Sequence, residues 1–294
     1  MKPPPVGYSR PASVAEALTT LAALGPEAKI LAGGQSLVPL MSMRLAAPAH
    51  LVDINRLADL SYVRHEAGQV RVGALARHAQ VLASPSATVQ PLLAKALRHV
   101  AHPAIRNRGT TVGSIVHADP AAEMPAVLAL LGGSVRLVSA SGERLVSASD
   151  FFLGVLESAA EPGELATEVA FPVLPPRAGT GFAEISRRRG DYAICGVAAM
   201  VRLAADGTVD DARAAYLSVG PCPQVLDLTE KLAGVAPGAV SLSAAVQLVR
   251  ERVDPEPDIH ATADYRRHLA GVLTERALLE SLGEAAGEPK GEAA

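Results

Sequence analysis

A pair of glycines between two apolar runs restricts the fold of this chain more than any other feature of its sequence. Residues 30–40 read Ile-Leu-Ala-Gly-Gly-Gln-Ser-Leu-Val-Pro-Leu, which predicts a strand, a tight loop and the start of a helix. Gly33 and Gly34 have no Cβ, so the backbone can turn with positive φ and a ligand can approach it closely. Ser36 can cap the helix that follows. Free N–H groups in such a loop suit an anion, above all a pyrophosphate, although an ordinary turn has the same composition.

A second loop, rich in small and hydroxyl residues, occupies residues 106–123. It reads Arg-Asn-Arg-Gly-Thr-Thr-Val-Gly-Ser-Ile-Val-His-Ala-Asp-Pro-Ala-Ala-Glu and lies between two segments with helical periodicity, so we expect a loop that closes over a ligand. Arg106 and Arg108 could contact phosphate, or they could be solvated or pair with neighbouring carboxylates. Glu123 stands in the first turn of the next helix, where the helix dipole favours a carboxylate.

Together the two loops resemble the FAD-binding segments of the medium, flavin-carrying subunit of molybdenum hydroxylases, the family that contains carbon monoxide dehydrogenase and xanthine dehydrogenase. The first loop of that family has the form A-G-G-x-S/T-L, which residues 32–37 fit at each position. The second has the form R-N-x-G-T-x-G-G-N/S-x-x-H-A-D-P-A-A-D/E, and this chain departs from it once, with Val112 in place of a glycine. Further matches are Val-Asp-Ile-Asn at 52–55, Ser-Arg-Arg-Arg-Gly-Asp-Tyr at 186–192 and Ala-Asp-Tyr-Arg-Arg-His-Leu at 263–269.

The resemblance implies a PCMH-type FAD-binding fold that holds one FAD without a covalent bond, its pyrophosphate on the N–H groups of residues 32–36 and 110–114. In the family, the residue at the Glu123 position lies close to the flavin, and the one at the Tyr192 position lies against its ring. A tyrosine there is typical of the carbon monoxide dehydrogenase-like branch, although Tyr192 could also fill a surface gap between lobes. The implied FAD-binding residues are Leu31, Ala32, Gly33, Gly34, Gln35, Ser36, Leu37, Thr110, Thr111, Gly113, Ser114, His117, Glu123, Leu165, Asp191 and Tyr192.

The resemblance also implies partner subunits and an electron path. Electrons would leave a molybdenum cofactor in a large subunit, cross two [2Fe–2S] clusters in a small iron–sulfur subunit, and reduce the FAD held by this chain. A quinone, NAD or oxygen would then take them, and the expected assembly is a dimer of heterotrimers. The protein of such a subunit positions and tunes its cofactor, so we expect neither a catalytic side chain nor a metal ligand here. The substrate would be set by the large subunit.

Composition narrows the function classes further. Lys and Arg number 27 and Asp and Glu 30, with no basic block, so neither nucleic-acid binding nor a membrane surface is favoured. No apolar run approaches the ~20 residues that span a bilayer, and residues 1–5 lack the apolar core of a signal peptide, so the cytoplasm is expected. Cys195 and Cys222 stand far apart and cannot hold an iron–sulfur cluster, and the eight histidines show no zinc-binding spacing.

The first half of the chain predicts two lobes of an α+β fold. A capping box at Ser13 to Glu16 starts a helix that Gly25 ends. This helix belongs to a small parallel β-α-β-α-β lobe that we expect over residues 1–56. A mixed or antiparallel lobe is expected over residues 57–175. In the first lobe the predicted strands are 29–32 and 51–54, and the predicted helices are 15–24 and 37–45. In the second lobe the predicted strands are 69–73, 134–138 and 144–146, and the predicted helices are 89–100 and 124–131.

A boundary is expected near the prolines of residues 171–176, so that 1–175 form an FAD-binding domain and 176–294 a C-terminal domain. The latter should contain a three-stranded antiparallel sheet, turns at Gly190-Asp191 and Asp206-Gly207, a helical bundle, and a disordered tail from Gly283 to Ala294. Its predicted strands are 182–188, 194–203 and 212–219, and its predicted helices 224–233, 242–252 and 263–282. The cluster Arg187 to Arg189 could contact phosphate or a partner, or be solvated.

Other enzyme classes find less support. The chain has no G-x-G-x-x-G, no G-x-x-x-x-G-K-[ST] and no G-x-S-x-G, so the Rossmann, P-loop and α/β-hydrolase interpretations fail at the motif. Two alternatives stay open. One is a stand-alone flavin oxidase of the vanillyl-alcohol-oxidase type, which would need a substrate domain. The other is a scaffold subunit without flavin, an interpretation to which Val112 gives weight because a β-branched residue at positive φ stores strain.

Overall fold

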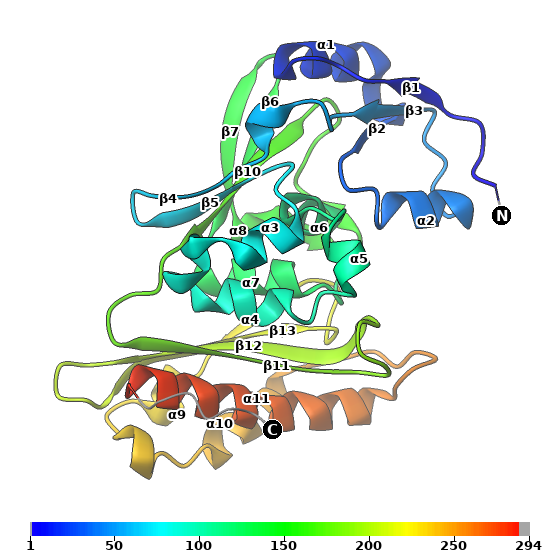
Figure 1. The fold of residues 1–294 in the computed structure, drawn as a ribbon. Helices are drawn as coiled ribbons and strands as arrows, with labels where there is room; N and C mark the ends of the chain where they lie inside the picture. The colour runs from blue at the N-terminus through cyan, green and yellow to red at the C-terminus, as the bar shows by residue number, and fades with distance from the viewer. Residues whose placement is uncertain (1, 288–294) are drawn as a thin grey trace. The chain divides into compact units, whose positions relative to one another are not determined.

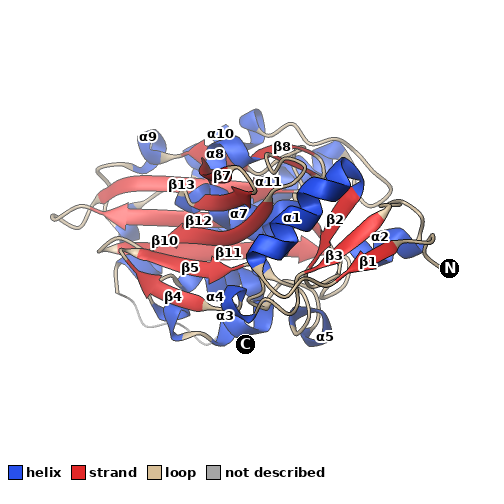
Figure 2. Ribbon diagram, turned by 90° about the horizontal axis from the view of Figure 1, so that it is seen from above, coloured by secondary structure: helices blue, strands red, loops and turns tan. Residues whose placement is uncertain are grey.

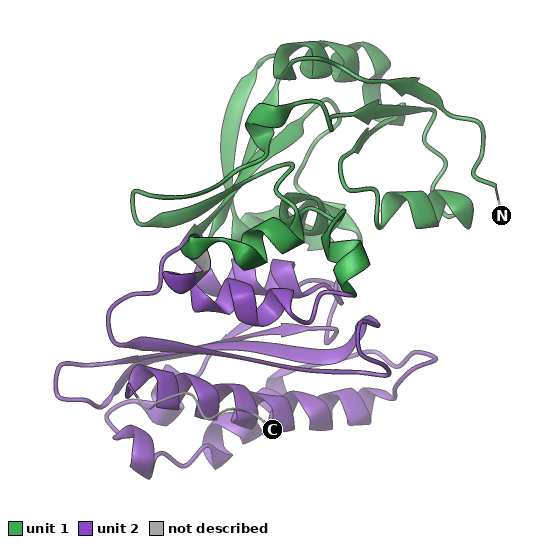
Figure 3. Ribbon diagram, in the orientation of Figure 1, with its two compact units in different colours: residues 1–86, 102–118, 132–171 green, residues 87–101, 119–131, 172–294 purple. Residues whose placement is uncertain are grey.

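The chain folds into two compact units, which Figure 3 distinguishes by colour. The computed structural model describes residues 2–287. Unit 1 contains the residues up to Ser86, His102–Ala118 and Gly132–Phe171; unit 2 contains Ala87–Ala101, Asp119–Leu131 and the residues from Pro172 onward. Neither unit is therefore one continuous segment. No helix within residues 2–287 has both the length and the apolar character needed to cross a membrane.

Unit 1 begins with a parallel three-stranded sheet in the order β1–β3–β2, whose short strands lie side by side in Figure 2. The strands are β1 (Gly7–Ser9), β2 (Ala28–Leu31) and β3 (His50–Asp53), and β3 pairs in parallel with both neighbours. Helices α1 (Val14–Leu24) and α2 (Leu37–Ser42) connect them. The predicted parallel β-α-β-α-β lobe is confirmed.

The ends of α1 follow from its sequence. The Ser13 hydroxyl accepts a hydrogen bond from the Glu16 N–H at 3.1 Å, as the capping box predicts. Gly25 ends the helix with a φ of +66°, a backbone conformation that favours glycine. Ala17, Leu18 and Leu21 form the buried face between these ends.

A second sheet of unit 1 has five strands in the order β4–β5–β10–β6–β7. The hairpins β4–β5 and β6–β7 are antiparallel, and β10 runs antiparallel to β6, so the antiparallel pairing expected in the second lobe is confirmed. The helices expected in that lobe over residues 89–100 and 124–131 belong to unit 2 instead. The strands are β4 (Val63–Glu66), β5 (Gln69–Gly73), β6 (Ser134–Ser139), β7 (Gly142–Ser147) and β10 (Leu165–Pro172). The other elements of this part are α3 (His78–Ala83), α5 (Pro103–Arg106), α6 (Thr111–His117), α8 (Ala148–Phe151), β8 (Phe152–Gly154) and β9 (Glu157–Ser158), with 3-10 turns at Gly25–Glu27, Ala58–Leu60 and Pro85–Thr88.

Unit 2 is a sheet covered by helices on both faces (Figure 1). The sheet is antiparallel, in the order β11–β12–β13–β14. Helices α4 and α7 lie on one face, and α9, α10 and α11 lie on the other. The bounds are β11 (Ala178–Ser186), β12 (Ala193–Leu203), β13 (Val209–Leu217), β14 (Gln224–Asp227), α4 (Pro91–Leu97), α7 (Glu123–Leu131), α9 (Thr229–Leu232), α10 (Ser243–Arg252) and α11 (Ala263–Ala285), with a 3-10 turn at Pro237–Ala239.

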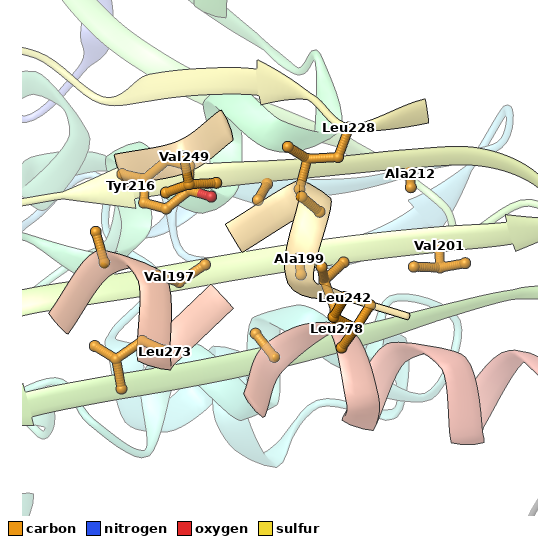
Figure 4. Packing of buried hydrophobic residues seen from close by; sticks show 14 of the residues in the cluster. Val197, Ala199, Val201, Ala212, Tyr216, Leu228, Leu242, Val249, Leu273 and Leu278 are labelled. Atoms are coloured by element: carbon orange, nitrogen blue, oxygen red, sulfur yellow. The ribbon is translucent and has the colours of Figure 1, made fainter. Parts of the chain in front are cut away.

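The long helix α11 packs unusually close to the edge strand β11. A Cβ on Gly179 would collide with the Ser281 carbonyl oxygen, and a Cβ on Gly181 would collide with that of Ala277. The backbones of helix and strand can approach only because both strand residues lack a side chain. Behind this contact, Val197 and Val201 of β12 and Leu273 and Leu278 of α11 join one buried apolar core (Figure 4).

The helix predicted over Gln224 to Ala233 is wrong in its first half. Residues Gln224–Asp227 form β14, which pairs with β13 and packs Leu226 against the core while Val225 is 40% exposed. The alternation of a strand at the sheet edge overrides the helical pattern, and the predicted three-stranded sheet gains a fourth strand. Only Thr229–Leu232 are helical.

Several other predicted elements differ at their ends. The helix expected over residues 89–100 is shorter, because Pro91 is tolerated only in a first helical turn. The helix expected over residues 37–45 ends at Ser42, before Arg44, which has a φ of +61°. The tail predicted to be disordered overlaps α11, which continues to Ala285; residues 288–294 of that tail lie outside the described residues.

A partly buried lysine joins three elements of unit 2. Lys95 of α4 donates to Glu284 Oε2 at 2.8 Å, lies 2.7 Å from Glu280 Oε1, and donates to the Thr180 carbonyl. Glu284 Oε2 also accepts from the Thr180 N–H at 2.9 Å. Burial alone would raise the pKa of Glu284, but the hydrogen bonds from Lys95 and Thr180 and the charge of Lys95 outweigh it and lower that pKa. Lys95 therefore links α4, β11 and α11.

We expect Lys95→Met to destabilise the protein by about 1–3 kcal/mol, because it leaves partly buried carboxylates without their cation. The control, Lys231→Met, removes an exposed pair with Glu230 and should cost less than about 0.5 kcal/mol. Urea unfolding measures both. The depressed pKa of Glu284 stabilises the fold above the usual carboxyl pKa and ceases to do so as the pH falls through the lowered value, so the difference between wild type and Lys95→Met should shrink below about pH 4. Equal losses for the two variants would contradict this account.

Candidate functional site

The first glycine loop presents a row of unpaired backbone donors. It connects β2, which ends at Leu31, to α2, which begins at Leu37, and Gly34 has a φ of +72°. The first hydrogen bonds of α2 come from the Val38 N–H to the Gly34 carbonyl and from the Leu40 N–H to the Ser36 carbonyl. Within residues 2–287, the N–H groups of residues 33–37 donate to no backbone or side-chain acceptor. Such a row of consecutive donors is an anion-binding arrangement.

Ser36 does not cap α2 as predicted. Its own backbone is helical, with φ −101° and ψ −49°, and its side chain makes no capping hydrogen bond. A capping side chain needs an extended backbone at that position, so the expectation was wrong for a physical reason. Gln35 instead turns back on the loop and donates from Nε2 to the Gly33 carbonyl at 3.0 Å.

The middle of the second loop forms helix α6 (Thr111–His117), where the sequence predicted a loop that closes over a ligand. Thr110 caps α6 with its side chain, accepting from the Gly113 N–H at 3.1 Å, and the Ser114 N–H donates to its carbonyl at 3.0 Å. The Thr111 N–H donates to Ala76 at 3.3 Å. Three of the donors expected to meet a pyrophosphate are thus already engaged. Thr110 stands three residues before Gly113, and a threonine whose hydroxyl can reach that N–H is a capping signal that the sequence contained.

The two loops touch through their backbones, within unit 1. A Cβ on Gly33 would lie 2.6 Å from the Arg108 carbonyl oxygen, 2.8 Å from Gly109 Cα and 3.0 Å from the Thr110 nitrogen. No side chain other than hydrogen fits between these atoms. Gly33 is therefore required by the packing of one loop on the other. The two loops, which were expected to form one site, are in direct contact.

Two residues outside the predicted set connect the loops as well. The Asn55 side chain donates to the Ala32 carbonyl at 2.8 Å and accepts from Arg77 at 2.6 Å. Arg77 also donates to the Arg108 carbonyl at 2.6 Å, so an Asn–Arg pair joins the first loop to the second. Burial and the charge of Arg108 lower the pKa of Arg77, and in the described chain it forms no ion pair. The Val-Asp-Ile-Asn match pointed to Asn55; nothing in the sequence marked Arg77.

Further groups fix the ends of this network. Asp53 accepts from the Tyr8 hydroxyl and from both nitrogens of Asn55, at 2.5–2.9 Å. Burial would raise its pKa, but these hydrogen bonds outweigh burial and lower it. His78 Nδ1 lies 3.1 Å from the Thr111 hydroxyl. Burial, with the charge of Arg106, lowers the pKa of His78 to about 4, so the ring is neutral at pH 7 and holds the side chain of Thr111.

Val112 takes a relaxed conformation. It lies in the first turn of α6, where φ is negative, and it is absent from the positive-φ residues of the described chain. Its side chain is 2% exposed and fills the interior of unit 1. The strain that would have supported a flavin-free scaffold is not present.

Of the remaining predicted residues, Glu123, Asp191 and Tyr192 belong to unit 2. Glu123 begins α7 and is 9% exposed, and Tyr192, which directly precedes β12, is 67% exposed. Partial burial and the negative charges of Asp119 and Glu123 raise the pKa of Tyr192, so these groups lie near one another. Burial and the negative charge of Glu123 also raise the pKa of Glu184, a residue that the sequence analysis did not single out.

The remaining predicted site residues lie in unit 1, whereas the arginine cluster at residues 187–189 lies in unit 2. Leu165 and His117 belong to unit 1, where Leu165 is 1% exposed at the start of β10 and His117 ends α6. Arg187 lies 3.8 Å from the Asp191 carboxylate, and the tip of the β11–β12 hairpin that carries the three arginines is exposed. In the described residues no cluster of three or more His, Cys, Asp or Glu could hold a metal ion.

Comparisons with known proteins agree with this geometry. Residues 4–174 match the family of the FAD binding domain in molybdopterin dehydrogenase, and residues 180–281 match the CO dehydrogenase flavoprotein C-terminal domain. The chain belongs to this family of flavoprotein subunits of molybdenum-containing dehydrogenases, as the two loops predicted.

Individual relatives are similar over nearly their full length. The 6-hydroxypseudooxynicotine dehydrogenase complex subunit alpha of Paenarthrobacter nicotinovorans is 40% identical, with 97% of each chain covered. Among solved structures, quinoline 2-oxidoreductase from Pseudomonas putida 86 has a TM-score of 0.91 at 38% identity, covering 97% of this chain and 100% of the other. Carbon monoxide dehydrogenase from Hydrogenophaga pseudoflava has a TM-score of 0.90 at 36% identity, with 96% and 98% covered.

We expect Gly33→Ala to separate the two loops and to lower FAD retention. The added Cβ meets backbone atoms that cannot rotate away, and such overpacking costs about 1–3 kcal/mol. The control is Gly238→Ala, whose Cβ would meet nothing within 4 Å. The measurement is the ratio of FAD to protein after gel filtration, together with the melting temperature. Wild-type retention in Gly33→Ala would show that the loop contact is dispensable.

We expect Val112→Gly to change FAD affinity by less than about tenfold, because Val112 already has helical backbone and its removal relieves no strain. The variant should instead be less stable, since glycine within a helix costs about 0.5–1 kcal/mol and buried side-chain contacts are lost. Titration of apoprotein with FAD, followed by flavin fluorescence, measures the affinity. A gain well above tenfold would mean that valine compromises the loop.

Proposed function

We propose that this chain is the FAD-carrying electron-transfer subunit of a molybdenum hydroxylase complex, passing electrons from an iron–sulfur subunit to an external acceptor. The observation that carries the proposal is the row of unpaired N–H groups at residues 33–37, set against the second loop in unit 1. The donors fit a pyrophosphate, which binds several N–H groups at once, and the contact at Gly33 holds the first loop against the second.

The residues present suit a non-covalent cofactor. We assign the pyrophosphate to the N–H groups of the first loop and to the Val112 N–H, which like them has no protein acceptor in the described chain. Charge-assisted hydrogen bonds of this kind contribute about 1.5–3 kcal/mol each, so several would retain the cofactor without a covalent link. Burial raises the pKa of the Cys195 thiol to about 12, which removes it as a nucleophile. The resemblance assigns the flavin ring to Glu123 and Tyr192.

Electron transfer then requires partners. When bound, FAD would accept electrons from a [2Fe–2S] cluster and release them to a quinone, NAD or oxygen. The described residues offer no metal-binding cluster, which supports iron–sulfur and molybdenum centres in separate small and large subunits. One relative is a subunit of a dehydrogenase complex, and the solved carbon monoxide dehydrogenase is a form that lacks the Mo-pyranopterin moiety of its molybdenum cofactor. The first supports an assembly with partner subunits here, which we expect to be a dimer of heterotrimers, and the second supports a molybdenum cofactor in that assembly. The division into domains 1–175 and 176–294, and the cytoplasmic location, stay predictions.

The decisive experiment separates a flavin relay from a flavin oxidase. Acid or heat precipitation of the assembled complex should release FAD into the supernatant in a one-to-one ratio with this chain. The isolated chain, loaded with FAD, should be reduced by dithionite but by no aldehyde, purine or carbon monoxide, because it lacks the centre that oxidises substrate. Flavin that stays with the precipitate would contradict non-covalent binding, and turnover by the isolated chain would establish the oxidase alternative.

A further inference from the structure

One buried arginine of unit 2 contacts two backbone carbonyls and one carboxylate at the same time. Arg266 of α11 is 6% exposed. Its Nη1 donates to the Ile194 carbonyl at 2.6 Å and to the Ser218 carbonyl at 3.1 Å, and its Nη2 lies 2.6 Å from Asp258 Oδ2. A guanidinium suits this arrangement because its donors are fixed in one plane and it stays charged. The start of β12 and the end of β13 are thereby fixed to α11.

Ser218 extends this contact to a third segment. It has a φ of +61°, a conformation that non-glycine residues adopt only when their surroundings require it. Its N–H donates to the Pro120 carbonyl at 2.8 Å, and its hydroxyl donates to the Ala193 carbonyl at 2.7 Å. Each polar group of Ser218 thus binds a different segment, and Arg266 holds Ser218 in place.

The segments joined in this way carry the two residues assigned to the flavin ring. Pro120 lies between Asp119 and Glu123, and Ala193 directly follows Tyr192. We propose that Arg266, acting through Ser218, is a positioning residue that fixes Tyr192 relative to Glu123, and so sets how the flavin ring is covered. This inference rests on the proposed function, because it takes both residues to face a flavin.

Asp258 keeps the arrangement charged. Burial would raise its pKa, but the hydrogen bonds from Arg266 and from the N–H groups of His260 and Ala261 outweigh it and lower the pKa to about 2. The carboxylate that pairs with Arg266 is therefore ionised throughout the working range of an enzyme. The Arg266–Asp258 ion pair should persist from about pH 5 to 9, a range that lies above the ordinary carboxyl pKa.

The chain offers a matched control one residue away. Among the described residues Arg267 pairs with Asp254 and Asp264, whose side chains are 98% and 96% exposed, so Arg267→Lys makes the same substitution, with the charge kept, without touching the network. The test variants are Arg266→Lys, which keeps the charge but cannot reach three acceptors, and Ser218→Ala, which removes only the hydroxyl bond to Ala193. All are prepared in the assembled complex.

Amide hydrogen exchange is the first measurement, and it does not require flavin. Exchange in residues 119–123 and 190–194 should be about two- to tenfold faster in Arg266→Lys, the change expected when one or two hydrogen bonds are lost, and unchanged in Arg267→Lys. In Ser218→Ala the increase should appear at 190–194. If Arg266→Lys does not fold, Ser218→Ala decides. Wild-type exchange at 190–194 in Ser218→Ala would overturn the proposal.

The flavin spectrum is the second measurement. Ser218→Ala should shift the FAD absorption bands while FAD occupancy stays near wild type, and the shift should vanish when Ser218→Ala is made in a Tyr192→Ala background. Equal shifts in both backgrounds would mean that Ser218 does not act through Tyr192 and would overturn the proposal. If the chain binds no FAD, the proposed function fails, but the exchange experiment still decides whether Arg266 joins the two segments.

Discussion

The backbone contact between the two loops at Gly33 is the constraint on which the candidate site depends. A loop of five free N–H groups binds an anion only if something holds its shape, and here the Arg108 carbonyl, Gly109 and Thr110 lie directly against it. The Asn55–Arg77 pair joins the same segments from the side, through neutral carbonyl acceptors. The donors are therefore arranged before a ligand arrives, so little ordering entropy is lost on binding.

In unit 2 the packing of helices on the sheet fixes the positions of a few polar side chains. Gly179 and Gly181 let α11 lie against β11, and this close approach places Arg266 on the same helix at the ends of β12 and β13. Lys95 fastens α4 to the same strand and helix. The position of Arg266 therefore depends on the packing of the whole helix, because a helix can place a side chain at a defined point only if the helix itself is fixed.

The parts of the fold that local pattern determines were predictable. Ser13 and Gly25 mark the ends of α1, and Gly33 and Gly34 mark the loop after β2, because caps and positive φ depend on one or two residues. The strand at Gln224–Asp227 could not be found this way, since its conformation comes from pairing with β13. The long-range contacts of the Arg77 side chain are not indicated by any spacing in the sequence. Arg266 lies within the match at residues 263–269, but that match does not indicate which carbonyls its side chain reaches. Thr110 is an intermediate case, because a threonine at this position is a capping signal but also has the composition of a loop.

The free donors of the first loop have a consequence for the life of the subunit before it meets its cofactor. An N–H group without a protein acceptor must bind water or a solute, and covering it with apolar surface costs about 1–3 kcal/mol. In the described chain residues 33–37 offer five such groups side by side. The empty loop should therefore hold ordered water on these N–H groups, and an incoming anion must replace that water with hydrogen bonds at least as good.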